Sequence, residues 1–366
     1  MKIAYIIVKG MPFGGGVEKY TEEIGARLAA KGHEVTVYAM RNYGAKNGFY
    51  KGMKIKTVPT IRNRSFEKIT ASLIATIKHC FEDNGTDIVH YHAFGPAMFS
   101  LIPRLLGRKV VTQGHGLEWK RSRWGFAGRL FLRLSEIPSV KFPNKLTVVS
   151  QVQQRYLRER YGIDSINIPT GVNKYSVERP DLIKQYGLQG NDYILFAARL
   201  VREKGVHYLI EAYNRLKSDV KLVIAGDAKH EEKYKSELNK LSGGNRDIIF
   251  TGFVTGKLLR ELFSNCFFFV LPSEIEGLPT VLLEAMSYGN CCLVSDIPEN
   301  LEALNSSGYT FKNKDVNDLT EKMAVLINNR EAVEEKKERA KKHVLGYYAW
   351  DNIALQLENL YEKLLH

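Results

Sequence analysis

Short apolar segments alternate with longer amphipathic segments along almost the whole chain, and this alternation restricts the possible folds more than any other feature. Apolar runs of about four to eight residues predict buried strands, and apolar residues spaced by three or four predict helices. Strands that alternate with helices are typical of βα units on a parallel sheet. The expected strands are Ile3–Val8, Glu34–Ala39, Lys54–Val58, Ile88–His90, Val110–Thr112, Leu146–Val149, Ile166–Ile168, Tyr193–Ala197, Lys221–Ala225, Ile248–Thr251, Phe267–Leu271 and Cys292–Ser295.

The chain of 366 residues is longer than one hydrophobic core usually organises, so we expect two domains. The strand series pauses after 166–168 and restarts at 193–197. Two doubly wound α/β domains in tandem are therefore predicted, over residues 1–171 and 172–346. Residues 347–366 have apolar side chains at helical spacing, and we expect this tail to cross back and pack on the first domain.

The net charge of +13 is concentrated in the first half of the chain. Residues 1–170 contain 27 Lys and Arg against 12 Asp and Glu, or +15, whereas residues 171–366 contain 26 against 28, or −2. The densest basic segment, residues 119–133, interleaves cations with aromatic residues. The candidate membrane or acceptor surface in this segment consists of Trp119, Lys120, Arg121, Arg123, Trp124 and Arg129.

Three kinds of partner could explain this basic segment. Basic residues beside interfacial aromatics suit an anionic membrane surface or a phosphate-bearing acceptor. The alternative is a solvated basic face whose aromatic rings reach into the core. Nucleic acid is the third candidate, but no helix-turn-helix, zinc-finger, RNP or KH signature accompanies the charge, so we expect no nucleic-acid partner.

The sequence also indicates a cellular compartment. The first apolar run is too short for a signal peptide, and no stretch approaches the roughly 18 apolar residues that a membrane span needs. The four cysteines show neither CxxC nor Cys/His ligand spacing, which predicts reduced thiols and no zinc site. We therefore expect a cytoplasmic protein that is peripheral on the inner face of the cell membrane.

Two glutamates eight residues apart mark the strongest candidate site. Glu276 follows the expected strand 267–271, and Glu284 stands two helical turns further on. Gly277 lets the backbone approach a ligand, Pro279 suits the first turn of a helix, and the amides of that turn attract anions. A ligand with hydroxyl groups at both ends and phosphates between them would fit. The alternative is an ordinary capped helix with an exposed glutamate.

Three further loops follow expected strands, where ligands bind in open parallel sheets. The glycines at 14–16 do not form a regular GxGxxG motif, so they indicate a close backbone approach, or a flexible turn, rather than a nicotinamide site. His115 lies between glycines after the strand 110–112 and is a candidate for substrate contact, although histidines in such loops are most often structural. Arg199 and Lys204 could neutralise a diphosphate, or be two solvated cations on a loop.

Together these motifs resemble the retaining GT-B glycosyltransferases of family 4, which include bacterial polysaccharide and lipid-linked sugar transferases. Glu276-x7-Glu284 is similar to the family's two-glutamate signature, and Arg199 with Lys204 is similar to its diphosphate-binding pair. The stretch 115–125 looks like a subgroup that acts in surface-polysaccharide assembly. The resemblance covers nearly the whole chain and implies two Rossmann-like domains that face each other across a cleft.

The resemblance also implies roles for single residues. Glu284 would bind the nucleotide ribose, Glu276 would face the donor sugar, and His115 would hydrogen-bond that sugar. The base would rest against residues 250–254, and Asp227 stands where relatives commonly have glycine. The implied catalytic residues are His115, Glu276, Arg199 and Lys204, and the implied donor-binding residues are Gly15, Gly16, Gly252, Val254, Gly277, Leu278, Pro279, Thr280 and Glu284.

The implied reaction moves a sugar from a nucleotide diphosphate sugar, with UDP as the expected nucleotide, to a hydroxyl of a glycan or lipid-linked acceptor. The acceptor attacks on the face from which the diphosphate leaves, and a departing phosphate oxygen can take the proton. No cofactor and no metal are expected. The alternatives are a sugar-nucleotide epimerase or phosphorylase of the same architecture, and a non-catalytic protein that binds nucleotide sugars.

Overall fold

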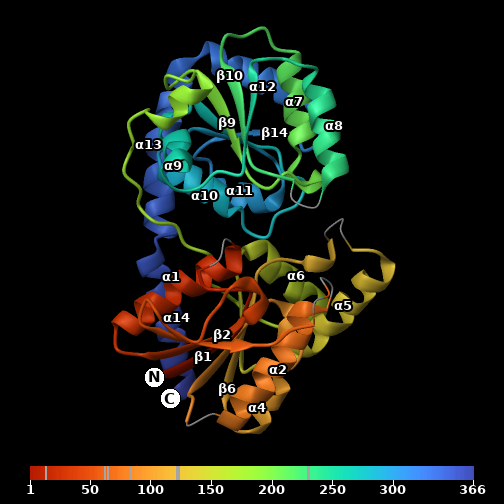
Figure 1. Ribbon diagram of the computed structural model, residues 1–366, viewed down its shortest axis with the longest axis vertical. Coiled ribbons are helices and arrows are strands. Elements are labelled where there is room, and N and C mark those ends of the chain that lie inside the picture. Colours follow the sequence, from red (N-terminus) through yellow and green to blue (C-terminus); the bar gives the residue numbers. More distant parts are fainter. Residues whose placement is uncertain (13–14, 62, 64–65, 83–84, 121–123, 229–230) are drawn as a thin grey trace. The chain divides into compact units, whose positions relative to one another are not determined.

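The computed structural model divides the chain into two compact units (Figure 1). It describes residues 1–12, 15–61, 63, 66–82, 85–120, 124–228 and 231–366. Unit 1 comprises Met1–Gly171 and Trp350–His366, and unit 2 comprises Val172–Ala349. The end of the chain thus returns to the first unit, and the returning segment begins at Trp350 rather than at residue 347.

Within its described residues, unit 1 contains an eight-stranded sheet of order β3-β4-β2-β1-β5-β6-β7-β8. Neighbouring strands are parallel except for the antiparallel pair of β3 with β4 at one edge. The strands are β1 (Lys2–Val8), β2 (Glu34–Met40), β3 (Gly48–Tyr50), β4 (Met53–Val58), β5 (Ile88–His92), β6 (Lys109–Gly114), β7 (Lys145–Val148) and β8 (Ile166–Asn167). The helices are α1 (Gly16–Ala30), α2 (Glu67–Glu82), α3 (Phe94–Ala97), α4 (Leu101–Leu105), α5 (Phe126–Lys141), α6 (Gln151–Tyr161) and α14 (Trp350–Leu365).

Helices cover both faces of this sheet, which explains why its central strand is an unbroken apolar run (Figure 1). Ile3 and Tyr5 of β1 belong to a core that includes residues of α1 and α14. Ala4 and Ile6, which point to the other face, belong to a core that includes residues of α2. The alternation of side chains along one strand therefore joins two separate helical layers.

The last helix, α14, is held to unit 1 by both apolar and polar contacts. Its buried residues recur at helical spacing from Trp350 to Tyr361, and this stripe packs in the α1 layer of the core. The Tyr361 hydroxyl lies 2.5 Å from His90 Nδ1. Glu358 accepts hydrogen bonds from Lys31 and from His33, the latter at 2.8 Å. Side chains far apart in the sequence thus specify where the tail docks.

Unit 2 contains a six-stranded parallel sheet of order β11-β10-β9-β12-β13-β14 within the part of the chain that the structure describes. The strands are β9 (Tyr193–Ala197), β10 (Lys221–Ala225), β11 (Ile248–Gly252), β12 (Phe268–Leu271), β13 (Cys292–Ser295) and β14 (Tyr309–Phe311). The helices are α7 (Val206–Asn214), α8 (Glu232–Ser242), α9 (Gly256–Asn265), α10 (Thr280–Ser287), α11 (Pro298–Leu304), α12 (Val316–Asn328) and α13 (Arg330–Tyr347).

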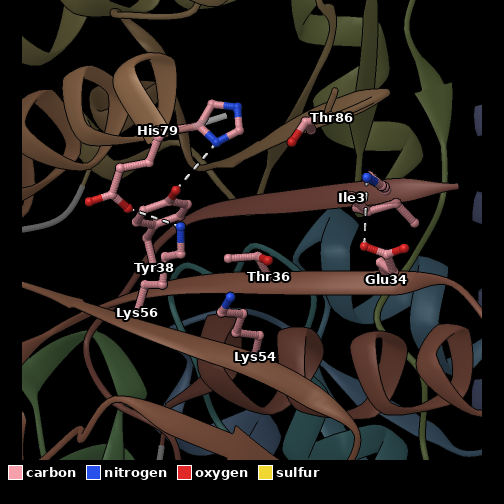
Figure 2. Close-up of a pocket in the computed structure, with 10 residues that line it drawn as sticks. Ile3, Glu34, Thr36, Tyr38, Lys54, Lys56, His79 and Thr86 are labelled. Carbon is pink, nitrogen blue, oxygen red and sulfur yellow. Dashed lines mark hydrogen bonds and ion pairs between the residues drawn. The ribbon is translucent and has the colours of Figure 1, made fainter. Parts of the chain in front are cut away.

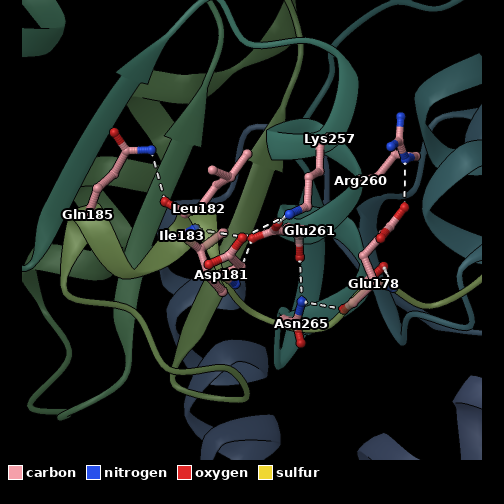
Figure 3. A network of polar contacts seen from close by, with 10 residues as sticks. Glu178, Asp181, Leu182, Ile183, Gln185, Lys257, Arg260, Glu261 and Asn265 are labelled. Atoms are coloured by element: carbon pink, nitrogen blue, oxygen red, sulfur yellow. Dashed lines mark hydrogen bonds and ion pairs between the residues drawn. The ribbon is translucent and has the colours of Figure 1, made fainter.

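A buried carboxylate ties the first segment of unit 2 to α9 (Figure 3). Glu261 of α9 is fully buried, and its Oε2 accepts hydrogen bonds from the backbone N–H groups of Asp181 (2.9 Å) and Ile183 (3.2 Å). Asn265, one turn later, donates to the carbonyl of Glu178 at 3.0 Å. The bond to Ile183 satisfies a backbone N–H group that would otherwise be buried without a partner.

Candidate active site

The four predicted donor-site side chains of unit 2 follow the carboxyl ends of two neighbouring strands, three of them in loops and one, Glu284, in the helix α10 (Thr280–Ser287). Arg199 and Lys204 follow β9, and Glu276 and Glu284 follow β12. Because β9 and β12 are adjacent and parallel, their carboxyl ends lie at the same edge of the sheet. This edge is where open parallel sheets bind ligands.

Lys204 and Glu276 form an ion pair, with Nζ and Oε1 2.5 Å apart. Only 14% of the lysine side chain and 8% of the glutamate side chain are exposed. Lys204 ends a 3-10 turn, Arg202–Lys204, and Gly205 follows with φ of +68°. An added Cβ at Gly205 would lie 1.9 Å from the carbonyl oxygen of Pro272, so only glycine allows this close approach between the two loops.

Arg199 and Glu284 line a single cavity of about 180 Å³ in unit 2. Its walls mix these charged residues with apolar side chains, which is typical of small-molecule sites. The cavity lies over the ends of β9 and β10. The residues that line it are Ala197, Ala198, Arg199, Ala225, Gly226, Asp227, Phe253, Val254, Leu259, Phe263, Val281 and Glu284.

The turn between the two glutamates differs in detail from the sequence prediction. The helix α10 begins at Thr280, so Pro279 precedes the helix instead of occupying its first turn. Glu276 lies before the helix, at the strand-to-helix turn as predicted, whereas Glu284 stands about one turn into the helix and not two. The loop that precedes α10 brings Glu276 to Lys204.

The other predicted donor-binding residues lie in the same region of unit 2, apart from two glycines in unit 1. Gly277 and Leu278 are in the loop between Glu276 and α10, and Gly252 ends β11, two residues before Val254. In unit 1, Gly15 caps α1 and Gly16 begins it, while Gly14 lies outside the described residues.

His115 of unit 1 follows β6 and contacts a second histidine that the sequence analysis did not select. Its Nε2 lies 3.1 Å from Nδ1 of His92, the last residue of β5. β5 and β6 are parallel neighbours, which brings both histidines to the carboxyl end of the sheet. Burial lowers the pKa of His115 to about 3, helped by the positive charge of Lys68, so the ring is neutral at physiological pH. The expected strand, Ile88–His90, ended two residues before His92, and the alternating pattern His90-Tyr-His92 was the signal that could have extended it.

The predicted basic and aromatic surface is only partly described. Arg121 and Arg123 lie outside the described residues. Lys120 and Arg129 are exposed, whereas Trp119 and Trp124 are half-buried, and the Arg133 guanidinium lies 4.2 Å from the centre of the Trp119 ring. The more exposed apolar side chains belong to α5, which begins within this segment at Phe126.

A stripe of exposed apolar residues runs along α5. Phe126, Leu130, Leu134 and Ile137 are spaced as neighbours on one helical face, and Phe126 is 85% exposed. The buried face of the same helix carries Ser135, Glu136, Ser139 and Val140. Phe126 and Leu130 lie in the basic segment 119–133, but the sequence prediction did not include the apolar stripe. Its helical spacing was the available signal.

A second cavity, of about 250 Å³, lies in unit 1 (Figure 2). It is lined by polar residues near the amino ends of β2 and β4 and the end of α2. Within it Lys56 pairs with Glu82 at 2.9 Å, and the Tyr38 hydroxyl lies 3.4 Å from His79 Nδ1. None of the predicted site residues lines this cavity.

The two units match two families of glycosyltransferase domains. Residues 14–174 match the model of Glycosyltransferase Family 4, and residues 178–343 match the model of Glycosyl transferases group 1. The chain is therefore similar to one domain of each kind, in this order along the sequence.

Individual relatives agree with this assignment. An uncharacterized glycosyltransferase of Methanocaldococcus jannaschii is 25% identical over 361 residues, 96% of each chain. A second one from the same organism is 30% identical over 190 residues, which is 50% of this chain and 48% of the relative. The structure of Anabaena HepE in complex with UDP and glucose superimposes with a TM-score of 0.81 at 16% identity, covering 99% of this chain and 100% of that chain. The fold is therefore GT-B, two Rossmann-like domains with parallel sheets.

Proposed function

We propose that the protein is a retaining glycosyltransferase that moves a sugar from a nucleotide diphosphate sugar to a hydroxyl of a glycan or lipid-linked acceptor, in polysaccharide or glycolipid biosynthesis. The observation that carries this proposal is the gathering of Arg199, Lys204, Glu276 and Glu284 at one sheet edge. UDP is the proposed nucleotide, supported by the HepE complex with UDP.

Each side chain has a distinct proposed role. Glu284 accepts hydrogen bonds from the ribose hydroxyls in the cavity that it shares with Arg199 and Val254. The base rests beside Val254 and the neighbouring Gly252. Lys204 and Arg199 hold the diphosphate and stabilise the negative charge that develops as it leaves. Glu276 faces the donor sugar and keeps Lys204 in place. His115 hydrogen-bonds the transferred sugar.

The acceptor hydroxyl attacks the anomeric carbon on the face from which the diphosphate departs. Its oxygen forms the new glycosidic bond, the bond from the anomeric carbon to the phosphate oxygen breaks, and that phosphate oxygen takes the hydroxyl proton. Positioning and charge stabilisation then supply the catalysis, without a protein base. Two cations at the diphosphate can perform the work that a metal ion performs in other transferases.

A sugar-nucleotide epimerase and a non-catalytic nucleotide-sugar binder are the alternatives. Neither requires an acceptor. Thermal-shift measurements against a panel of nucleotide sugars identify the donor, because a ligand that binds the native state raises the melting temperature. Nucleotide release from that donor is then measured with and without candidate acceptors. Release that depends on an acceptor supports the transferase, epimerised donor without release supports the epimerase, and a melting shift without either product supports the binder.

We also propose that the enzyme works as a peripheral protein on the inner, cytoplasmic face of the cell membrane. In the described part of the chain, no helix has the length and apolar character needed to cross a bilayer. The α5 stripe of Phe126, Leu130, Leu134 and Ile137 supplies apolar contact, and Lys120, Arg129 and Arg133 supply positive charge beside it. Exposed apolar side chains flanked by cations suit an interface with anionic lipid.

Sedimentation with vesicles tests this placement. We expect binding to vesicles that contain phosphatidylglycerol, weaker binding to phosphatidylcholine alone, and loss of binding at high salt. Phe126→Ser should weaken binding, whereas Phe81→Ser, which alters an 88% exposed phenylalanine on α2, should not. Binding that is insensitive both to salt and to Phe126→Ser would contradict the proposal.

A further inference from the structure

A line of three hydrogen-bonding side chains leads from α1 to His115 across the ends of β5 and β6. The Thr21 hydroxyl lies 2.9 Å from the carbonyl of Val17 and 3.0 Å from Nε2 of His92. Nδ1 of His92 in turn lies 3.1 Å from Nε2 of His115. Thr21 and His92 are buried, whereas His115 is half-buried and closer to solvent.

The direction of each hydrogen bond follows from the first member of the line. We assign the single hydroxyl proton of Thr21 to the carbonyl of Val17, which lies 2.9 Å away and can only accept. The hydroxyl oxygen can then only accept from His92, which must carry its proton on Nε2. Burial lowers the pKa of His92 well below its usual value, so the ring is neutral and its Nδ1 has a lone pair. That lone pair accepts from the Nε2–H of His115.

The same argument assigns which ring nitrogen of His115 carries the proton. With its one proton on Nε2, the neutral ring carries a lone pair on Nδ1 and can only accept a hydrogen bond there. Aromatic contacts restrict both rings. Tyr20 lies edge-on to His115, with ring centres 5.4 Å apart, and Tyr5 stacks on His92, with ring centres 5.4 Å apart.

We propose that Thr21 and His92 are positioning residues that hold His115 as its Nε2–H tautomer, so that Nδ1 accepts a hydrogen bond from a hydroxyl of the transferred sugar. This inference rests on the proposed function for the sugar contact, although the tautomer itself does not. It adds a specificity rule: the donor sugar must present a hydroxyl at the position facing His115. If the sugar has only a hydrogen-bond acceptor at that position, its lone pair faces the lone pair of His115 Nδ1, and no hydrogen bond forms.

The tautomer is tested first, in the full chain without ligand. Histidine labelled with ¹⁵N reports by NMR which ring nitrogen carries the proton, and His115→Gln assigns the signal. We expect His115 to be protonated on Nε2 in the wild type and in Thr21→Ser, which keeps the hydroxyl. Thr21→Val removes the acceptor for His92 and should move the His115 proton toward Nδ1. A wild-type His115 protonated on Nδ1, or no change in Thr21→Val, would overturn the proposal.

The specificity rule is tested with the donor found by the thermal-shift panel. Fluorine accepts weakly and cannot donate, so donors are compared in which one sugar hydroxyl at a time is replaced by fluorine. We expect one such donor to lose about tenfold or more in kcat/KM with the wild type and Thr21→Ser, and much less with Thr21→Val. Equal sensitivity in all three proteins would overturn the rule. Absence of any donor binding or transfer by the wild type would instead count against the proposed function, and the NMR result would still decide the tautomer.

Discussion

Lys204 and Glu276 form a partly buried ion pair whose members come from loops after two adjacent strands, with their charged atoms 2.5 Å apart. Removal of one member of such a pair leaves a poorly solvated charge without compensation. The pair therefore serves both the proposed chemistry and the packing of the two loops. Substitutions that test its chemistry must keep the side-chain volume.

Lys204→Met should lower kcat by roughly 10²- to 10³-fold, because the diphosphate loses a positive charge as it departs. Nucleotide release measured with donor and acceptor checks this. Arg339→Ala, which breaks an exposed pair with Glu335 on α13, is the control and should leave turnover unchanged. Wild-type turnover in Lys204→Met would remove this lysine from the mechanism.

Glu284→Gln should weaken binding of free UDP by roughly tenfold or more, because a hydrogen bond to a charged acceptor contributes about 1.5–3 kcal/mol. Titration calorimetry with UDP measures the effect without any need for an acceptor. Glu321→Gln alters an exposed glutamate of α12 and should bind UDP normally. Unchanged affinity in Glu284→Gln would mean that the ribose does not lie in this cavity.

Glu261→Ala should destabilise unit 2 by about 1–3 kcal/mol, because the backbone N–H groups of Asp181 and Ile183 lose their acceptor. Burial alone would raise the pKa of Glu261, but the hydrogen bonds from these backbone groups outweigh it and lower the pKa. A carboxylate whose pKa is lowered in the folded state stabilises the protein at pH values above the carboxylate's unfolded-state pKa. That stabilisation is lost as the pH falls through the folded-state pKa.

Urea unfolding of the full chain at several pH values measures the difference in the free energy of unfolding between the wild type and Glu261→Ala. The free-energy gap between wild type and Glu261→Ala should be constant from pH 8 to pH 5 and should shrink below about pH 4.3, the usual glutamate pKa. Glu335→Ala, at an exposed position, should change stability little at any pH. A gap that grows with acid would contradict the assigned direction of the pKa shift.

Gly171→Ala should destabilise unit 1 by about 1–3 kcal/mol, because the new Cβ would lie 2.5 Å from the buried Trp350 ring. Gly346→Ala is the matched control in α13, where an added Cβ meets no described atom within 4 Å. Because alanine has a higher helix propensity than glycine, Gly346→Ala should be as stable as the wild type or more stable. Thermal melting of both variants compares them, and equal melting temperatures would show that Trp350 can move aside.

The sequence predicted the βα order well because strand and helix periodicities are local properties. Short elements were missed: the edge strand Gly48–Tyr50, the helices Phe94–Ala97 and Leu101–Leu105, and the strand Tyr309–Phe311 were not expected. Each is too short to show a period. Helix α5 was not named among the expected elements, and its first half, residues 126–133, was assigned to the basic segment.

The sequence by itself determined the two-unit α/β architecture and the loops that carry Arg199, Lys204, Glu276, Glu284 and His115, since each follows a strand that its own residues define. Only the tertiary structure decided that Lys204 pairs with Glu276, that His92 lies against His115, and that α14 packs in unit 1. These contacts join residues that are 23 or more positions apart in the sequence. The hydrophobic pattern of a segment predicts that the segment will be buried, but it does not predict which other segment it will contact.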